Sequence, residues 1–343
     1  MNGGPVSVIY VSRGSHGHRI DYDRVLIAEM KALDIHLERI EETRYAVDTS
    51  RPFLFSMLDS HLVDFFLHAL VRSARGRRTV GLFFRADTCF SKTSIKYRIK
   101  RKLFRAVSKL PHVHVLGLIP FAAWPSSAEV TTAWIYDPQM WDLLHFGFKE
   151  NSTLPALRDL LAGKARGRKI LVALGVQSKD KGFEYLADLW CCSAEIREKF
   201  LFVVAGNVEH ESEHRIGLFV EHGGLLMNRR ISNDELMSMY SCAAVVWSCY
   251  SPDYDQASGI FGRAFQMGVP VVVRNNSYLE RLGGNLGHPT LPVPFGEAAV
   301  SAERLVAWKP AAPEPAQRLK LINELRAYSL KVLAGCLRPD SLA

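Results

Sequence analysis

The sequence lacks any apolar run long enough to cross a membrane, and it lacks the cysteine spacing of a disulfide framework or a zinc site. No window of the 343-residue chain approaches the roughly 20 apolar residues that a membrane-spanning helix needs. The six cysteines include no Cys-x-x-Cys pair, which favours free thiols packed as small core residues. No charged segment followed by an apolar one precedes Val6, so no secretion signal is expected. We therefore expect a cytoplasmic protein.

What the chain does contain is an apolar content of 48%, enough for two well-packed domains of ordinary size. Continuous apolar runs separated by helical patterns are typical of parallel sheets covered on both faces. The expected strands are 6–11, 35–40, 79–84, 113–116, 170–174, 200–204, 243–247 and 269–273. Residues 53–75 instead have helical apolar spacing. The pattern predicts an α/β fold with domains over 1–150 and 151–311, followed by a helical segment, 312–343, that returns to the first domain.

Polar loops follow three of the strands in the second half. In an open parallel sheet, ligands bind at the carboxyl ends of the strands, and a helix that starts there attracts phosphates. Each loop taken alone fits a tight turn or a solvated surface segment equally well. The loop residues of interest are Gly175 and Lys181 after 170–174, Gly206 and Asn207 after 200–204, and Ser258 and Gly259 after 243–247.

In their order along the chain, these pieces resemble the carboxyl-terminal half of glycosyltransferase family 4, over about residues 168–300. That family has the GT-B architecture, two Rossmann-like domains that face each other across a cleft. The resemblance implies that Lys181 grips the diphosphate of a nucleotide-sugar donor. It implies that the backbone at Ile231 contacts the base and that the amides of Ser258, Gly259 and Ile260 cradle the phosphates. Gly175, Gly206 and Asn207 belong to the same implied donor site.

Two positions depart from the family pattern. An arginine of the family's glycine- and lysine-containing loop is replaced by Val176. The family's two glutamates, eight residues apart, fall on Asp255 and Arg263, so the first charge is kept and the second is reversed. Arg263 cannot accept hydrogen bonds from ribose hydroxyls, as the second glutamate commonly does in the family. Either Arg263 contacts a donor phosphate, or donor binding has been lost.

The loop after the first strand is the candidate site of the amino-terminal half. Gly14 and Gly17 would permit a close backbone approach to the donor phosphates. His16 or His18 is a candidate to touch the acceptor or the phosphates. A metal pair of these histidines has no evident third ligand, so no metal is expected.

Arg85 and Asp87 follow the expected strand 79–84. They either line the same cleft or form a turn in which Asp87 caps the next helix.

Two Asp-x-Asp triplets have a spacing that could hold a metal ion. Asp21 and Asp23 lie at an expected helix start, where carboxylates cap unpaired amides. Asp253 and Asp255 lie in the donor loop, and the resemblance implies a donor site that needs no metal. No metal or other cofactor is therefore expected, the nucleotide-sugar being a substrate.

The segment 92–109 contains eight Lys and Arg residues and no acid. Ile95, Ile99, Leu103 and Val107 recur at helical spacing within it, and Phe104 and Leu110 lie alongside. This pattern fits an interfacial helix attracted to anionic lipid, and it fits equally a helix packed on the core with a solvated basic face. No aromatic stacking platform or RNA motif accompanies the helix, so nucleic acid is not the expected partner.

The predicted function is a retaining, metal-independent glycosyltransferase of polysaccharide biosynthesis, with a glycan or lipid-linked glycan as acceptor. Lys181 would stabilise the leaving diphosphate, Asp255 would lie near the sugar hydroxyls, and His16 would serve the acceptor side. The expected location is cytoplasmic, at the inner face of the membrane. A nucleotide-sugar epimerase of the same architecture is an alternative. A non-catalytic protein that binds a glycan or a partner is another, because Val176 and Arg263 depart from the family.

Overall fold

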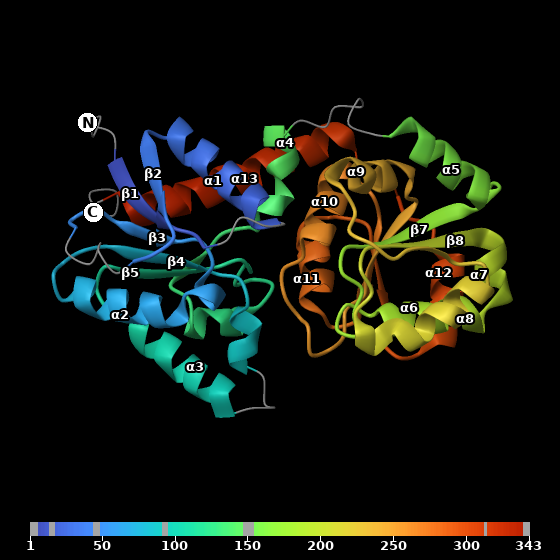
Figure 1. Cartoon of the computed structure of the whole chain (residues 1–343), viewed down its shortest axis with the longest axis horizontal. Helices are drawn as coiled ribbons and strands as arrows, with labels where there is room; N and C mark the ends of the chain where they lie inside the picture. The colour runs from blue at the N-terminus through green and yellow to red at the C-terminus, as the bar shows by residue number, and fades with distance from the viewer. Residues whose placement is uncertain are drawn as a thin grey trace. The chain divides into compact units, whose positions relative to one another are not determined.

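The computed structural model describes residues 6–13, 18–43, 49–90, 95–146, 154–311 and 314–338. The chain divides into two compact units (Figure 1). The first unit comprises residues 1–142 and 323–343, and the second comprises 143–322. Two helices contain the boundaries, α4 (Asp142–Phe146) and α13 (Pro315–Leu337).

The first unit is built on a six-stranded sheet of order β2-β1-β3-β4-β5-β6, in which every strand pairing that the structure describes is parallel. Its strands are β1 (Val6–Val11), β2 (Ile35–Ile40), β3 (Phe53–Phe55), β4 (Thr79–Phe83), β5 (Val113–Gly117) and β6 (Ala133–Trp134). Its helices are α1 (His18–Ala32), α2 (Leu62–Ser73) and α3 (Ile95–Val107), with 3-10 turns η1 (Leu58–Ser60), η2 (Ala86–Phe90), η3 (Pro125–Glu129) and η4 (Pro138–Met140).

Helices cover both faces of this sheet, with α1 and the end of α13 on one face and α2 and α3 on the other (Figure 1). The core under α2 and α3 is aromatic: the Phe83 and Phe104 rings stack with centroids 4.1 Å apart, and Phe65 packs beside them. On the other face, Arg326 of α13 donates two hydrogen bonds to Glu29 of α1, at 2.7 and 2.6 Å. Apolar burial and one partly buried ion pair thus hold the helices on this sheet.

The second unit repeats the plan with a parallel sheet of order β12-β11-β10-β7-β8-β9. Its strands are β7 (Lys169–Leu174), β8 (Phe200–Ala205), β9 (Leu225–Met227), β10 (Val245–Ser248), β11 (Val271–Arg274) and β12 (Thr290–Val293). Its helices are α5 (Pro155–Ala165), α6 (Phe183–Cys192), α7 (Ala194–Lys199), α8 (Ile216–Glu221), α9 (Asn233–Cys242), α10 (Gly259–Met267), α11 (Tyr278–Asn285) and α12 (Ala298–Ala307), with the turn η6 (His210–Arg215). On one face, α6, α7, α8 and α12 pack around Trp190 and Phe202.

The predicted α/β fold with two parallel sheets is confirmed. The expected helix over 53–75 is wrong at its start, because Phe53–Phe55 form the fully buried strand β3 and the helix begins only at Leu62. A short run of buried apolar residues has no periodicity that separates helix from strand.

The capping role expected for Asp23 is also wrong. Helix α1 begins at His18, which places Asp23 inside the helix. Its buried carboxylate accepts hydrogen bonds from Tyr10 Oη at 2.6 Å and Ser12 Oγ at 2.9 Å, which tie α1 to β1. No helix in the part of the chain that the structure describes is long and apolar enough to span a bilayer.

Candidate functional site

The loops after β7 and β8 are joined through their backbones at the carboxyl edge of the second sheet. The amide of Gly175 donates to Ala205 O at 3.0 Å, and the amide of Gln177 donates to Asn207 O at 2.8 Å. Gly206 has φ +139°, and a Cβ atom there would lie 1.8 Å from Gly175 O. Only glycine permits this approach, so Gly175, Gly206 and Asn207 form one rigid turn at the strand ends.

Lys181 projects into this turn from the residues just before α6. Its Nζ atom lies 3.8 Å from the position that a Cβ atom at Gly175 would take. Burial lowers the pKa of Lys181, and the negative charge of Glu209 opposes that shift. Within the ranges that the structure describes, the ammonium has no hydrogen-bond or ion-pair partner. A half-buried cation without a partner is stabilised when an anion joins it, which makes this position a candidate anion site.

The start of α10 reaches the same place. Ser258 is its N-cap and accepts a hydrogen bond from Phe261 N at 3.3 Å, and its Oγ also bonds Tyr250 Oη at 2.7 Å. The next residue pair, Gly259 and Ile260, opens the helix. Ile260 Cδ1 lies 3.8 Å from the position of a Cβ at Gly175, beside Lys181 Nζ. The first amides of a helix have no intrahelical partner and carry partial positive charge, so they add to the cation of Lys181.

The loop after β9 completes this edge. Asn228 Oδ1 accepts a hydrogen bond from Val208 N at 2.8 Å, which links the loops after β8 and β9. Ile231 precedes Ser232, which forms a capping box with Glu235 at the start of α9. The hydrogen bond from Arg229 lowers the pKa of Glu235 to about 2. The backbone at Ile231 is therefore held in a well-ordered turn.

Asp255 and Arg263 lie on either side of the α10 start. Asp255 Oδ1 accepts from Tyr278 N at 2.8 Å and pairs with Arg274 at 3.2 Å, and its Oδ2 lies 3.8 Å from Arg281. These contacts anchor the loop to β11 and α11. Arg263 is buried within α10. Val176 is 44% exposed, so the family's arginine is replaced by a solvent-facing apolar side chain.

Gly14, His16 and Gly17 lie outside the described residues, as does the side chain of His18. The first sheet does place other polar groups at its carboxyl edge. Lys100 Nζ bonds Asp59 Oδ1 and Thr88 Oγ1, both at 2.9 Å, and Asp59 Oδ2 accepts from Arg85 N at 3.0 Å.

Asp87 lies beside this cluster, in the turn η2. Burial raises the pKa of Asp87 to about 6. One of its carboxyl oxygens is fully buried and has no hydrogen-bond partner among the described residues. The sequence offered two interpretations of Asp87, as a residue that lines the cleft and as a helix cap. Neither predicted this unpaired oxygen.

Sequence reasoning missed two contributors to the second sheet's edge, Glu209 and Tyr250. Both follow a buried strand within a few residues, which is the signal that identified Lys181 and Ser258. Glu209 N donates to Gln177 O at 2.8 Å, so it belongs to the joined loops, and Tyr250 bonds the N-cap of α10.

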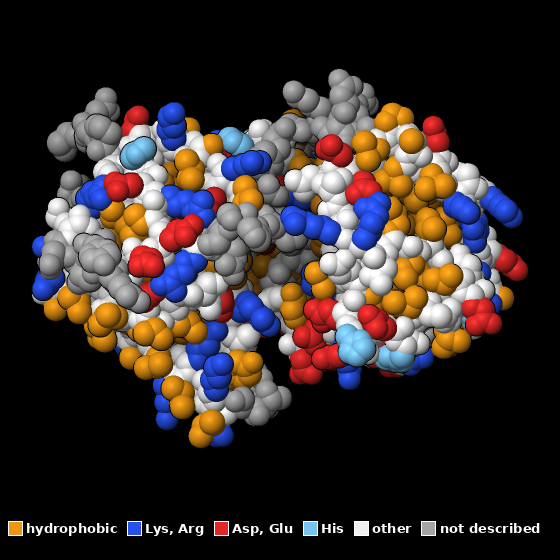
Figure 2. Space-filling view, viewed as in Figure 1, with side chains coloured by type: hydrophobic (Ala, Val, Ile, Leu, Met, Phe, Trp, Pro, Cys, Tyr) orange, Lys and Arg blue, Asp and Glu red, His pale blue; other side chains and the backbone are white. Residues whose placement is uncertain are grey.

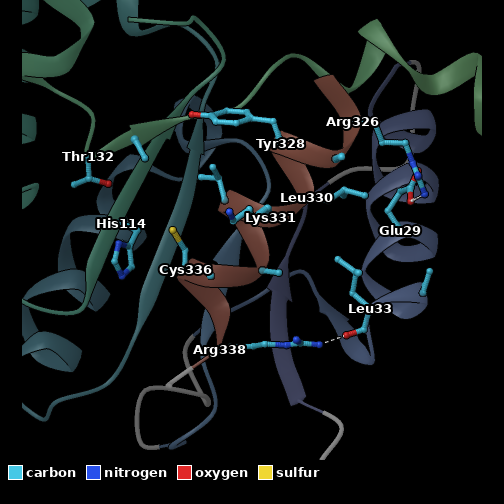
Figure 3. Close-up of a pocket in the computed structure, with 16 residues that line it drawn as sticks. Glu29, Leu33, His114, Thr132, Arg326, Tyr328, Leu330, Lys331, Cys336 and Arg338 are labelled. Atoms are coloured by element: carbon cyan, nitrogen blue, oxygen red, sulfur yellow. Dashed lines mark hydrogen bonds and ion pairs between the residues drawn. The ribbon is translucent and has the colours of Figure 1, made fainter. Parts of the chain in front are cut away.

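A cavity of about 970 Å³ lies in the first unit along α13 (Figure 3). Glu29, Arg326 and Arg338 line it on the side of α1, and His114 and Thr132 line it on the side of β5 and β6. Burial lowers the pKa of His114 to about 4, so this ring is neutral at physiological pH. His114 is the second residue of β5, so the cavity is remote from the carboxyl end of that strand.

In the second unit, the Lys181 ammonium and the Ile260 side chain at the start of α10 thus both lie close to the backbone of Gly175, which contacts Gly206. Such a set holds a polyanion such as a diphosphate through a point charge and backbone amides. Among the described residues, no group of His, Cys, Asp and Glu side chains is arranged to hold a metal ion.

No family model and no curated protein sequence matches the chain. Solved structures do match it along its whole length. Anabaena HepE, solved in complex with UDP, is 12% identical with a TM-score of 0.64, covering 96% of this chain and 100% of its own. An α,α-trehalose 6-phosphate synthase from Burkholderia multivorans is 11% identical with a TM-score of 0.60 and 98% coverage of both chains. WaaG, a glycosyltransferase involved in lipopolysaccharide biosynthesis, is 12% identical with a TM-score of 0.55, covering 97% of this chain and 100% of its own. At these identities the likeness establishes architecture, and the chain has the GT-B fold.

Proposed function

We propose that this protein is a glycosyltransferase that binds a nucleotide-sugar donor at the carboxyl edge of the second sheet. The observation that carries the proposal is the half-buried Lys181 ammonium, which has no partner among the described residues and lies beside Gly175 and the Ile260 side chain of α10. A diphosphate would supply the missing anion. HepE, a structure of the same fold, binds UDP, so uridine diphosphate is the first donor product to test.

The proposed reaction develops negative charge on the leaving diphosphate as the sugar departs. Lys181 and the amides of Gly259 and Ile260 would stabilise that charge without rearranging, because the joined loops already hold them in place. The resemblance to family 4 supports retention of anomeric configuration without a metal, with the donor phosphate taking the acceptor proton. Gly14, Gly17 and His16 remain proposed contacts from the amino-terminal side.

Asp255 and Arg263 keep proposed roles at the donor. The contacts of Asp255 with Arg274 and Tyr278 fix its carboxylate, and each of its oxygens can still accept a further bond from a sugar hydroxyl. Arg263 is proposed to contact a donor phosphate, since a guanidinium suits phosphate and cannot accept from ribose hydroxyls. The proposed acceptor is a glycan or a lipid-linked glycan.

Titration calorimetry with nucleoside diphosphates and their sugars tests the donor site. Lys181→Ala should weaken binding of the preferred diphosphate about 10- to 100-fold, the value of one charge-assisted hydrogen bond. Transfer to the acceptor should fall at least as far. Lys179→Ala is the matched control, because Lys179 is exposed in the same loop and should leave affinity unchanged.

Three results would count against the proposal. Equal losses of diphosphate affinity in Lys181→Ala and Lys179→Ala would contradict the role assigned to Lys181. No binding of any nucleotide by the wild-type protein would favour the non-catalytic alternative. Interconversion of a nucleotide-sugar without an acceptor would identify an epimerase.

A further inference from the structure

Helices α2 and α3 each expose a stripe of apolar side chains. On α2 the exposed residues are Val63 (81%), Leu67 (55%) and Leu70 (58%), and on α3 they are Ile95 (67%), Ile99 (53%) and Leu103 (48%). The three residues on α2 are spaced by four and then three positions, and the three on α3 by four and four. Each set therefore lies on one side of its helix. We call these six side chains the α2–α3 patch.

The patch is separate from the surfaces by which these helices pack on the core. Helix α3 packs through Phe104 and Val107, both buried, and the Phe66 and Phe104 rings join α2 to α3 with centroids 5.0 Å apart. Helix α3 thus packs on the core through Phe104 and Val107 and leaves Ile95, Ile99 and Leu103 about half exposed or more. Figure 2 shows hydrophobic side chains spread over the lower edge of the first unit.

The charges around the patch are almost all basic. Helix α3 carries Lys and Arg side chains and no acid, and Arg98 and Lys102 are exposed on it. Asp64, the acid on α2, pairs with Arg13 at 2.7 Å. Two acids face α3 and are already paired, Glu129 with Arg101 and Arg105, and Asp59 with Lys100. An approaching surface therefore meets apolar side chains flanked by net positive charge (Figure 2).

We propose that the α2–α3 patch docks the protein onto an anionic lipid bilayer. The six apolar side chains would enter the boundary between headgroups and acyl chains, and the basic side chains would lie among the lipid phosphates. Charge complementarity selects this occupant. A second copy would bring the same cationic helix against itself, and the core of a protein interface is normally depleted of lysine. This inference rests on the proposed function in one respect: it takes the acceptor to be a molecule that the membrane presents.

Co-sedimentation of the full chain with vesicles provides the test. Wild-type protein should sediment with vesicles that contain phosphatidylglycerol, and far less with pure phosphatidylcholine. Ile99→Ser with Leu103→Ser should abolish sedimentation. Leu218→Ser with Val220→Ser is the matched control, because these exposed residues of α8 have similar exposure, 45% and 48%. That control should behave as wild type.

The electrostatic part is tested separately. Each of Arg98→Gln and Lys102→Gln should reduce the partition constant about fivefold on anionic vesicles, the effect of one basic residue near such a surface. Added salt should also weaken the binding of the wild type to anionic vesicles.

Two results would overturn the docking proposal. One is equal sedimentation of the Ile99/Leu103 variant and the wild type. The other is a wild-type dimer in sedimentation velocity that the same variant dissociates, which would make the patch an interface between copies. Lys181→Ala should sediment with vesicles as wild type does, and the Ile99/Leu103 variant should keep nucleotide affinity. Failure at the patch and failure at the donor site are thereby distinguished.

Discussion

Different chemical groups occupy the carboxyl edges of the two sheets, although both sheets have six parallel strands. In the second unit, three neighbouring loops bond to one another mostly through backbone groups, and the half-buried ammonium of Lys181 has no partner among the described residues. In the first unit, side chains occupy the edge: Lys100 is paired with Asp59, and Asp87 keeps a buried oxygen unpaired. One edge suits a phosphate, and the other suits groups that donate hydrogen bonds, such as sugar hydroxyls.

The largest expected effect comes from breaking the backbone contact of the second edge. In Gly206→Ala the new Cβ would lie 1.8 Å from Gly175 O at a φ of +139°, so the loops must separate. We expect a loss of stability of about 3 kcal/mol or more, together with loss of nucleotide binding. Thermal unfolding and calorimetry measure the two effects.

The control for this change is Gly217→Ala. Gly217 lies inside α8, and no atom falls within 4 Å of its added Cβ. Alanine there should raise stability by about 0.5–1 kcal/mol. If Gly206→Ala unfolded at the same temperature as this control, the joined loops would not be the rigid element described above.

Asp87→Asn tests the buried carboxyl group at the carboxyl edge of the first sheet. Burial raises the pKa of Asp87 from 3.8 to about 6, so the folded state binds its proton more tightly than the unfolded state. Stability should therefore fall as pH rises from about 4 to about 6 and stay low above that range. The uncharged asparagine should remove this fall and stabilise the protein by about 2 kcal/mol at neutral pH.

Unfolding midpoints measured across this pH range check the prediction. The wild type and Asp87→Asn should converge near pH 4 and diverge above it. Asp253→Asn, at an exposed carboxylate of the second unit, should track the wild type throughout. Parallel curves for Asp87→Asn and the wild type would mean that another group causes any pH dependence.

The fold was predictable from sequence where strands are long and buried on both faces. Phe200–Ala205 is such a strand, and residues 8–11 of β1 are equally buried; their unbroken apolar runs leave few alternatives. Strand β3 has only three residues, and its apolar residues continue the spacing of the helix that comes after it. Strand β12 contains Pro292. Edge or short strands of this kind are specified by neighbours that only the folded chain brings close.

The candidate site was predictable to the extent that its residues lie in loops that follow buried strands. Lys181 and Ser258 lie in such loops, and the structure places the Lys181 ammonium and the side chain of Ile260, two residues after Ser258, beside the Gly175 backbone. The partners of Asp255 were not predictable, because Arg274 and Arg281 lie 19 and 26 residues later in the sequence. Pairing across such separations depends on the fold and leaves no local pattern.

The smallest predicted effect isolates the helix start within the second edge. Ser258→Ala removes the acceptor for Phe261 N and the partner of Tyr250 Oη, which should cost about 1 kcal/mol of stability. Affinity for the nucleoside diphosphate should fall severalfold, less than in Lys181→Ala, since the first amides of α10 remain but lose part of their orientation.

Ser193→Ala separates capping from binding. Ser193 caps α7 by the same geometry, accepting from Ile196 N at 3.2 Å, but it lies at the amino side of β8. Both variants should therefore lower the unfolding midpoint by similar amounts, and only Ser258→Ala should weaken nucleotide binding. If neither changed the affinity, the start of α10 would not contact the phosphates, and the anion site would reduce to Lys181 and the turn formed by Gly175 and Gly206.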